Sequence, residues 1–290
     1  MDIAVFGANG QLGRSIESIS SNYPKHNFIF TDIDELNLMY ASDIEEFVSY
    51  NNPDVFINCA AYTAVDMAEQ DVVAAMDING RAVSNLAKIA AEHDIFMVHV
   101  STDYIFDGRT YKPYKEADNV HPLSVYGRTK WKGEVAVAKS SCRHATVRTS
   151  WLYSEYRTNF VKTMLRLSAE LEQISVVFDQ IGTPTYAHDL AKAIMKIVEV
   201  NEKEELTGTF NYSNEGVASW YDFAVEIMQL GNRKCKILPI TTAEYPTPAK
   251  RPHYTVLDKQ KIRDTFEITI PHWRDGLKRC MENIMNNSQS

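Results

Sequence analysis

The sequence has few cysteines, and their spacing does not suggest that they pair. The four cysteines are far apart and include no C-x-x-C pair; they are Cys59, Cys142, Cys235 and Cys280. A small fold held by disulfides needs a denser set, and a thiolate metal site needs paired cysteines. We therefore expect neither a disulfide framework nor a thiolate metal site, and the composition fits the reducing cytoplasm.

Long apolar runs are missing as well. No stretch approaches the roughly 18 apolar residues that are needed to cross a bilayer. The first expected strand begins at Ile3, which leaves no room for a charged segment followed by an apolar one. We expect no membrane span and no targeting segment.

Basic blocks are also absent, and the formal net charge of the 290 residues is -8. This argues against nucleic acid or an anionic membrane surface as the main partner. An anionic small ligand can still bind where basic residues are placed locally.

What the sequence does have is enough apolar residues, 44% of the chain, to fill a well-buried core. In the first half, helical patterns alternate with short apolar runs, namely IAVF, NFIFTD, VFINCA, IFMVHV and HATVRTS. Strands that alternate with helices are typical of βαβ units. The pattern predicts an α/β fold with a Rossmann-type doubly wound parallel sheet.

A helix is expected to begin near Met67 and to continue to His93. Its apolar residues have the spacing of a face that packs on a sheet: Val83, Leu86, Ala87 and Ala90. Gly80 in its interior suggests that another segment approaches closely. After residue 150 the pattern loosens. We therefore predict a dinucleotide-binding domain over residues 1–150 and a smaller domain over 151–290 that mainly binds substrate.

The stretch VFGANGQLG places Gly7, Gly10 and Gly13 between a strand and a helix. Such glycines let a turn close tightly and let the backbone approach a pyrophosphate at the helix N-terminus. Alone, the spacing also fits an ordinary glycine-rich turn. The next strand, however, ends in Asp32, about 20 residues further on, where a carboxylate can accept hydrogen bonds from an adenosine ribose. Although Asp32 would also serve as a helix cap, the combination favours dinucleotide binding.

The identity of the dinucleotide is left open by two residues of opposite charge. Asp32 would repel a 2′-phosphate and favours NADH, whereas Arg14, directly after the loop, would accommodate one and favours NADPH.

Polar residues follow the apolar run IFMVHV, which should be a buried strand: Ser101, Thr102 and Asp103. Tyr126 and Lys130 follow at i, i+4 spacing, so on a helix their side chains share one face. A nearby ammonium is expected to lower the pKa of a tyrosine and so enable proton transfer. Such a pair also arises on helix surfaces, but together with Thr102 it suits hydride transfer at a carbonyl.

Seven motifs follow one another over about residues 3–195: GANGQLG, NCAAYTAVDMAE, STDYIFDG, YGRTKWKGE, RTSWLY, NFVKTML and DQIGTPTYAHDLA. Together they resemble the extended short-chain dehydrogenase/reductases, and more narrowly the dTDP-4-dehydrorhamnose reductase family. The last third is similar mainly through RPHYTVLD. The glycine loop is common to many dinucleotide folds, whereas STDYIFDG with YGRTK and DQIGTPT is more restrictive. The resemblance implies reduction of the C4 keto group of dTDP-4-dehydro-L-rhamnose by NADPH or NADH, as a step in supplying dTDP-L-rhamnose for polysaccharides.

The resemblance also implies roles for single residues. The catalytic residues would be Thr102, Tyr126 and Lys130. The cofactor would contact Gly7, Gly10, Gln11, Leu12, Gly13, Asp32, Asn37, Leu38, Ala61, Tyr62, Thr63, Tyr126 and Lys130. Asn37 departs from the family, which often has an aspartate there.

The implied contacts to the dTDP-sugar are Thr102, Asp103, Trp151, Asn159 and Arg251. Trp151 is equally well interpreted as a core aromatic at a strand end. Asn159 and Arg251, implied near the diphosphate, are each also interpretable as a helix cap or a loop residue.

One departure from the family concerns metal binding. Some members bridge a homodimer through magnesium held by acidic side chains, at positions that correspond here to Ser15 and His188. Because a hard cation prefers carboxylate oxygens, we expect no such magnesium, and any homodimer would form without it.

Two other functions share these motifs. A sugar-nucleotide epimerase or dehydratase would have the same glycine loop and Tyr/Lys pair, but it would keep its nicotinamide cofactor tightly bound. The third hypothesis is a non-catalytic regulatory subunit that resembles the reductase, as occurs with methionine adenosyltransferase. The presence of Thr102, Tyr126 and Lys130 together favours an enzyme.

Overall fold

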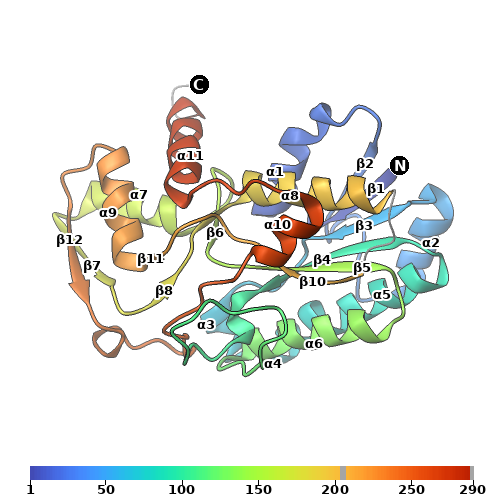
Figure 1. Ribbon diagram of the computed structural model, residues 1–290, viewed down its shortest axis with the longest axis horizontal. Helices are drawn as coiled ribbons and strands as arrows, with labels where there is room; N and C mark the ends of the chain where they lie inside the picture. Colours follow the sequence, from blue (N-terminus) through green and yellow to red (C-terminus); the bar gives the residue numbers. More distant parts are fainter. Residues whose placement is uncertain (203–206, 288–290) are drawn as a thin grey trace.

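The structure is a computed structural model that describes residues 1–202 and 207–287. Its centre is a six-stranded parallel sheet in the order β10-β5-β4-β3-β1-β2 (Figure 1). The predicted doubly wound parallel sheet is thereby confirmed. The strands are β1 (Asp2–Phe6), β2 (Asn27–Thr31), β3 (Val55–Asn58), β4 (Phe96–Thr102), β5 (His144–Thr149) and β10 (Gly208–Asn211).

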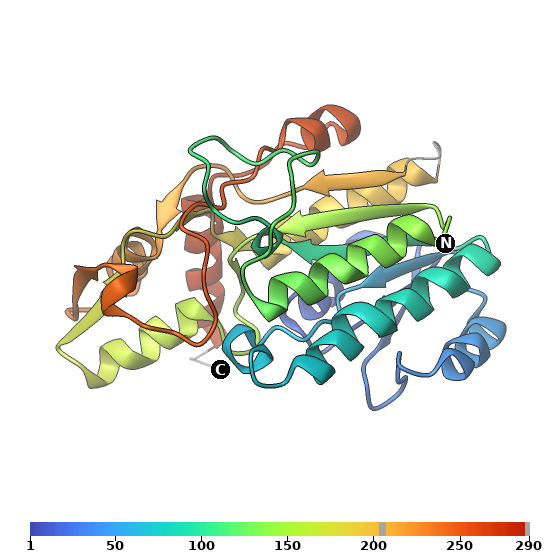
Figure 2. The same cartoon turned by 90° about the horizontal axis from the view of Figure 1, so that it is seen from below.

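Helices cover both faces of this sheet. One face is covered by α1 (Gln11–Ile19), α8 (Ala187–Asn201) and α10 (Gln260–Phe266). The other is covered by α2 (Ala41–Asn51), α5 (Val83–Glu92) and α6 (Val125–Lys139), of which α5 and α6 run side by side in Figure 2. Strands covered on both faces need apolar residues at consecutive positions. All four residues of β3 are accordingly buried.

The helix expected from Met67 to His93 is interrupted. It consists of α3 (Val65–Ala68), α4 (Val72–Met76), a π-helical segment (Asp77–Ala82) and α5. A new helix begins at α4 because the side chain of Asp71 accepts a hydrogen bond from the backbone N–H of Ala74. The close approach expected at Gly80 comes from the same helical run, since a Cβ there would lie 2.9 Å from the sulfur of Met76, whereas the nearest atom of another element, Lys132 Cβ of α6, would be at an ordinary contact distance of 3.8 Å.

The second half of the chain builds a smaller layer with its own apolar core (Figure 1). Its helices are α7 (Phe160–Glu170), α9 (Trp220–Leu230) and α11 (Trp273–Asn287). Three two-stranded sheets accompany them: β7 (Gln173–Val177) with β12 (Lys236–Ile240), β8 (Ile181–Gly182) with β11 (Ala218–Ser219), and β6 (Leu152–Tyr153) with β9 (Thr185–Tyr186). Single-turn 3₁₀ segments lie at Ser20–Asn22, Asp103–Ile105 and Thr242–Glu244.

The chain passes between the two layers more than once. From the second half, α8 packs on the central sheet and β10 joins it next to β5. A domain division at residue 150 stays a prediction, and a division by layers would assign α8, β10 and α10 to the first domain.

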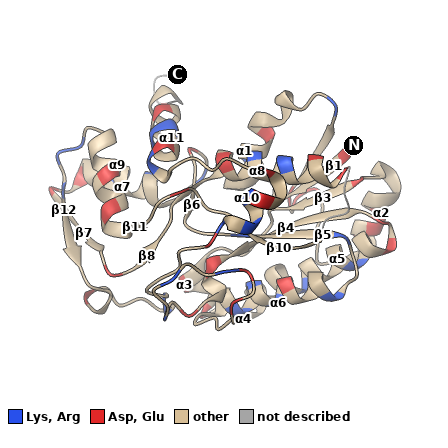
Figure 3. Cartoon of the chain, viewed as in Figure 1, with Lys and Arg blue, Asp and Glu red and all other residues tan. Residues whose placement is uncertain are grey.

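Charged residues of both signs are interspersed on the helices, as Figure 3 shows for one view. Within the described ranges, no helix is long and apolar enough to cross a membrane.

Candidate active site

The site lies where the strand order reverses. From β1 the chain continues to β2 on one side, and then crosses to β3, β4 and β5 on the other. At such a switch point the loops after neighbouring strands separate and leave a crevice at their carboxyl ends. Two cavities lie there. The first, of about 350 Å³, runs from the glycine loop to β2, and the second, of about 510 Å³, runs from the glycine loop toward β4, β5 and α9.

The glycine loop allows three backbone segments to meet. Gly7 has a left-handed φ of 74°, and a Cβ there would lie 2.6 Å from the backbone nitrogen of Ala60 after β3. A Cβ at Gly13 would lie 2.5 Å from the carbonyl oxygen of Gly7. Gly10 is the N-cap of α1 and lines both cavities. The free N–H groups of the first turn of α1 therefore open onto the junction of the two cavities, a placement that suits a phosphate.

Residues of the second half of the chain form hydrogen bonds with the residue that follows this loop, Gln11. Gln11 donates a hydrogen bond from Nε2 to the carbonyl oxygen of Leu152 at 3.4 Å. Its Oε1 accepts from Ser154 Oγ at 3.1 Å and from Asn159 Nδ2 at 2.8 Å. Gln11 and Leu12 both line the second cavity. The loop that would hold a pyrophosphate is thus tied to the segment after β6.

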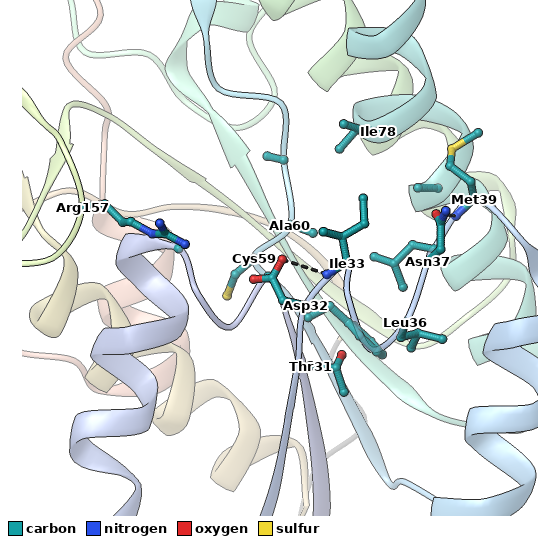
Figure 4. A pocket seen from close by; sticks show the side chains of 16 residues that line it. Thr31, Asp32, Ile33, Leu36, Asn37, Met39, Cys59, Ala60, Ile78 and Arg157 are labelled. Carbon is teal, nitrogen blue, oxygen red and sulfur yellow. Dashed lines mark hydrogen bonds between the residues drawn. The ribbon is translucent and has the colours of Figure 1, made fainter.

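Asp32 lies in the first cavity directly after β2 (Figure 4). Its Oδ2 accepts from the backbone N–H of Asn9 at 2.8 Å, and its Oδ1 accepts from that of Ile33 at 2.8 Å. Asn37 and Leu38 line the same cavity. Its other apolar side chains include Ile33, Leu36, Met39 and Ile78. An apolar slot beside a carboxylate suits an adenine and its ribose.

The three residues predicted near a nicotinamide follow β3. Ala61 lines both cavities and Thr63 lines the second. Tyr62 is held through its backbone by Asn79 of the π-helical segment, whose Oδ1 accepts from the Tyr62 N–H at 2.9 Å and whose Nδ2 donates to the Tyr62 carbonyl at 3.1 Å. The same Nδ2 donates to Thr129 of α6 at 3.1 Å. Asn79 was not predicted, although its position before Gly80 within a helical pattern was an available signal.

The three predicted catalytic residues come together in the second cavity. Thr102 ends β4, whereas Tyr126 and Lys130 lie one turn apart on α6, which begins with Ser124 as a side-chain cap. The closeness of α6 to the end of β4 requires Gly127, because a Cβ there would collide with the carbonyl oxygen of Tyr104. The Thr102 hydroxyl acts on the Tyr126 phenol by opposing the rise of its pKa, while it donates its own proton to Asp103 Oδ1.

The expected lowering of the tyrosine pKa is wrong for this structure. Burial raises the pKa of Tyr126 to about 12, although the Thr102 hydroxyl opposes the increase. The ammonium of Lys130 donates to the carbonyl oxygen of Val100 at 2.7 Å. Burial lowers the pKa of Lys130 to about 8, against the opposite effect of Glu134. Desolvation therefore dominates both groups and shifts the pKa of each in the direction that favours the neutral form, although Lys130 stays mostly charged at pH 7.

Glu134 belongs to a buried network behind Lys130 that the sequence analysis missed. It forms an ion pair with Arg148 of β5, and the N–O distance is 2.8 Å with both side chains at least 96% buried. Ser101 Oγ also donates to Glu134. The network joins α6 to β4 and β5 beneath the site.

Asp103 is also buried next to the catalytic residues and lines the second cavity. Its Oδ1 accepts from the Thr102 hydroxyl at 3.1 Å. Its Oδ2 has no hydrogen-bond partner within residues 1–202 and 207–287. Burial raises the pKa of Asp103 to about 7, although the hydroxyls of Thr255 and Thr102 oppose the increase.

Of the other predicted substrate contacts, Trp151 and Asn159 line the second cavity. Trp151 has a left-handed φ of 47°, and its ring stacks on Trp220 of α9 with 3.7 Å between centroids. Trp220 was not predicted, because nothing in the sequence links it to Trp151. Asn159 caps α7 by accepting from the backbone N–H of Lys162, so the capping role left open for it is present.

Arg251, the remaining predicted substrate contact, lines neither of the two cavities. Its guanidinium forms a two-pronged ion pair with Asp66 of α3, at 3.0 and 2.7 Å.

The two positions that correspond to the family's magnesium ligands, Ser15 and His188, carry no carboxylate, and each already has a partner within the chain. The Ser15 hydroxyl donates to the carbonyl oxygen of Gln11, and His188 contacts Glu155 at 3.0 Å. Among the residues described, no group of three or more metal-ligating side chains is placed to hold a metal ion. The expectation that magnesium does not bind stays a prediction.

Comparison with known proteins gives concordant matches. A family model described as RmlD substrate binding domain matches residues 1–286. A dTDP-4-dehydrorhamnose reductase from Aggregatibacter actinomycetemcomitans is 40% identical over 285 residues, which cover 95% of this chain and 97% of that protein. The spore coat polysaccharide biosynthesis protein SpsK of Bacillus subtilis is 34% identical and covers 97% of this chain and 96% of its own length.

Solved structures agree. A dTDP-4-dehydrorhamnose reductase from Clostridium acetobutylicum superposes with a TM-score of 0.93 at 40% identity, over 98% of this chain and 100% of that one. A dTDP-4-dehydrorhamnose reductase from Bacillus anthracis in complex with NADP has a TM-score of 0.93 at 37% identity, over 97% and 99% of the two chains. The chain therefore belongs to the dTDP-4-dehydrorhamnose reductase family.

Proposed function

We propose that this protein reduces the C4 keto group of dTDP-4-dehydro-L-rhamnose to give dTDP-L-rhamnose, with NADPH or NADH as the hydride donor. The observation that carries the proposal is the convergence of Thr102, Tyr126 and Lys130 in the second cavity, which adjoins the first cavity at the glycine loop. Family membership supports the same reaction.

The residues of the first cavity fit a nicotinamide dinucleotide. Gly7 and Gly13 leave no room for a Cβ, so the backbone forms a cradle at the start of α1. We assign the pyrophosphate to Gly10, Gln11 and Leu12, with the adenosine beside Asp32, Asn37 and Leu38. Ala61, Tyr62 and Thr63 would contact the nicotinamide side. When bound, the reduced cofactor supplies the hydride.

The raised pKa of Tyr126 suits a reduction. A phenol with a pKa of about 12 is protonated at neutral pH, so it is ready to donate its proton to the alkoxide oxygen that forms at C4. Thr102 would donate its hydroxyl proton to that oxygen, in place of Asp103 Oδ1, to which it donates in this structure. Lys130, with a pKa of about 8, is still mostly charged at neutral pH, and its ammonium would stabilise the phenolate left behind and would hold the ribose of a bound cofactor.

The sugar nucleotide would occupy the second cavity. Thr102, Asp103 and Trp151 are the proposed contacts to the sugar, and Asn159 the contact near the diphosphate. Arg251 also remains a proposed diphosphate contact. That role requires Arg251 to leave Asp66, with which it is paired in this structure.

The direct test supplies dTDP-4-dehydro-L-rhamnose and reduced cofactor and follows the loss of absorbance at the reduced-nicotinamide band. NMR should identify dTDP-L-rhamnose as the product. If the cofactor is not oxidised, the reductase function is rejected. If another C4 epimer forms, the chemistry stands and the named product is wrong. Tightly bound nicotinamide in the purified protein would instead favour an epimerase or dehydratase.

We infer that the protein works in the cytoplasm and supplies rhamnose for polysaccharides. All four cysteines are free thiols, which fits a reducing compartment, and the relative SpsK is named as a spore coat polysaccharide biosynthesis protein. A homodimer without bridging magnesium remains a prediction, which light scattering with and without a chelator would test.

A further inference from the structure

Arg157 lies over the glycine loop although it comes from the second half of the chain. Its Nε donates to the carbonyl oxygen of Asn9 at 2.7 Å. It lines both cavities, a position shared only with Gly10, Cys59 and Ala61 among the residues that line them. In Figure 4 its side chain points toward the loop from the side opposite Asn37 and Met39. Arg157 therefore stands at the junction of the two cavities.

The charge of Arg157 is not neutralised by the chain. Among the residues described, no carboxylate forms an ion pair with it, and Nε is the only donor of its guanidinium with a protein acceptor. Arg157 as a whole is exposed. Arg14, the other guanidinium near Asn9, is different: it pairs with Glu17 at 3.0 Å and lines neither cavity.

The backbone conformation of Arg157 is also unusual. Its φ is 53°, in the left-handed region that disfavours residues with a Cβ. Such conformations persist where the surroundings hold them, and they concentrate at ligand sites. The neighbouring loop residues Ser154 and Asn159 are tied to Gln11, so the loop that carries Arg157 is anchored to the glycine loop on both sides.

We propose that Arg157 binds the pyrophosphate of the dinucleotide, opposite the N-terminus of α1, and that the second half of the chain thereby closes over the cofactor. With the adenosine in the first cavity and the nicotinamide entering the second beside Ala61 and Thr63, a residue at the junction of the two cavities meets the pyrophosphate, which NADH and NADPH share. The planar guanidinium can donate two parallel hydrogen bonds to phosphate oxygens. The inference rests on the proposed function only in requiring a nicotinamide dinucleotide.

The experiment measures the dissociation constants of NADPH and NADH by calorimetry for the wild type and for Arg157→Gln. Both constants should rise by about 10-fold or more, the usual effect of losing a charged hydrogen bond, and by the same factor. Arg157→Lys should restore part of the affinity because it keeps the charge. Arg166→Gln is the matched control, since Arg166 is an exposed arginine of α7 in a surface ion pair.

The outcomes separate the inference from the proposed function. Unchanged affinities in Arg157→Gln, with a normal melting temperature, would overturn the inference and leave the reductase intact. A loss for NADPH alone would assign Arg157 to the 2′-phosphate and would also overturn it. If the wild type binds neither cofactor, the proposed function fails as well.

Discussion

At the scale of single residues, Tyr126 and Lys130 lie one turn apart on α6, but their side chains have different partners. Tyr126 interacts with Thr102, and Lys130 donates to the carbonyl oxygen of Val100. Spacing on a helix places two residues on one face, but it does not make one of them the main influence on the other's pKa. Burial controls both.

The proton donor can be tested by Tyr126→Phe, which removes the phenolic hydroxyl and keeps the ring. Turnover should fall by about two to four orders of magnitude, the usual span for losing a general acid. Calorimetry should show cofactor affinity nearly unchanged, because the ring still fills its place. Near-normal turnover would move the acid elsewhere, for example to a water held by Thr102.

Asp103 predicts a pH dependence of stability. Its pKa is raised from 3.8 to about 7 by burial, so the folded protein binds this proton more tightly than the unfolded chain does. The resulting stabilisation is complete below pH 3.8 and is lost as the pH rises through about 7. Asp103→Asn cannot ionise. Its stability relative to the wild type should therefore increase from pH 4 to pH 7, by at most about 1.4 kcal/mol per pH unit.

Denaturant unfolding at several pH values measures this difference. Asp107→Asn is a suitable control, because Asp107 is a nearby aspartate with no such burial. A difference between the wild type and Asp103→Asn that does not change with pH would contradict the prediction.

At the scale of elements, the site depends on how loops and helices are attached to the sheet. The glycine loop connects β1 to α1, and α6 is joined to β4 and β5 through Glu134. Each attachment yields a prediction that is specific to its element.

The glycine loop is tested at Gly10, whose Cβ position lies 3.2 Å from the carbonyl oxygen of Gly7. Gly10→Val should place its side chain at the junction of the two cavities and reduce NADPH binding below detection in calorimetry. Gly10→Ala should show a smaller loss, because its side chain is shorter. Circular dichroism should show an intact fold in both. An unchanged affinity in Gly10→Val would remove the loop from the cofactor site.

The attachment of α6 is tested at the buried ion pair. Glu134→Ala leaves the guanidinium of Arg148 buried without its partner, so the free energy of unfolding should fall by about 3–5 kcal/mol. Replacing both residues by apolar ones, Glu134→Leu with Arg148→Met, should recover much of that loss in denaturant unfolding. If the double variant were as unstable as the single one, the unpaired charge would not be the cause.

At the scale of the whole molecule, the two halves of the chain meet across the site. Gln11 and Asn9 of the first half contact Leu152, Asn159 and Arg157 of the second. On another side, Asp66 of α3 pairs with Arg251. These contacts close the cleft in which both ligands would lie.

The Asp66–Arg251 pair distinguishes two roles for Arg251. If Arg251 binds the diphosphate, Arg251→Ala should weaken sugar-nucleotide binding by about 1.5–3 kcal/mol. Asp66→Asn, which leaves Arg251 charged and unpaired, should then preserve or tighten that binding. If Arg251 only joins the two halves, both variants should instead lower the melting temperature to a similar extent and affect binding alike. Calorimetry and thermal unfolding of the two variants separate these results.

Much of the fold and of the site was predictable because the relevant signals are local. Continuous apolar runs predicted strands covered on both faces, and glycines between a strand and a helix predicted the loop where the cavities meet. Thr102 and Asp103 were identifiable because they directly follow an apolar run. The broken helix before α5 was missed, because its apolar periodicity outweighed the cap at Asp71 and the role of Asn79 depends on a contact with Tyr62.

The sequence by itself determined the sheet, the glycine loop and the identity of the residues at the strand ends, since these follow from periodicity and from the order of residues along the chain. The tertiary structure alone decided which groups are buried and which charges are paired. It raised the pKa of Tyr126, paired Arg251 with Asp66 and placed Arg157 over the loop. The physical reason is that desolvation and ion pairing depend on segments far apart in the sequence, whose proximity no local pattern specifies.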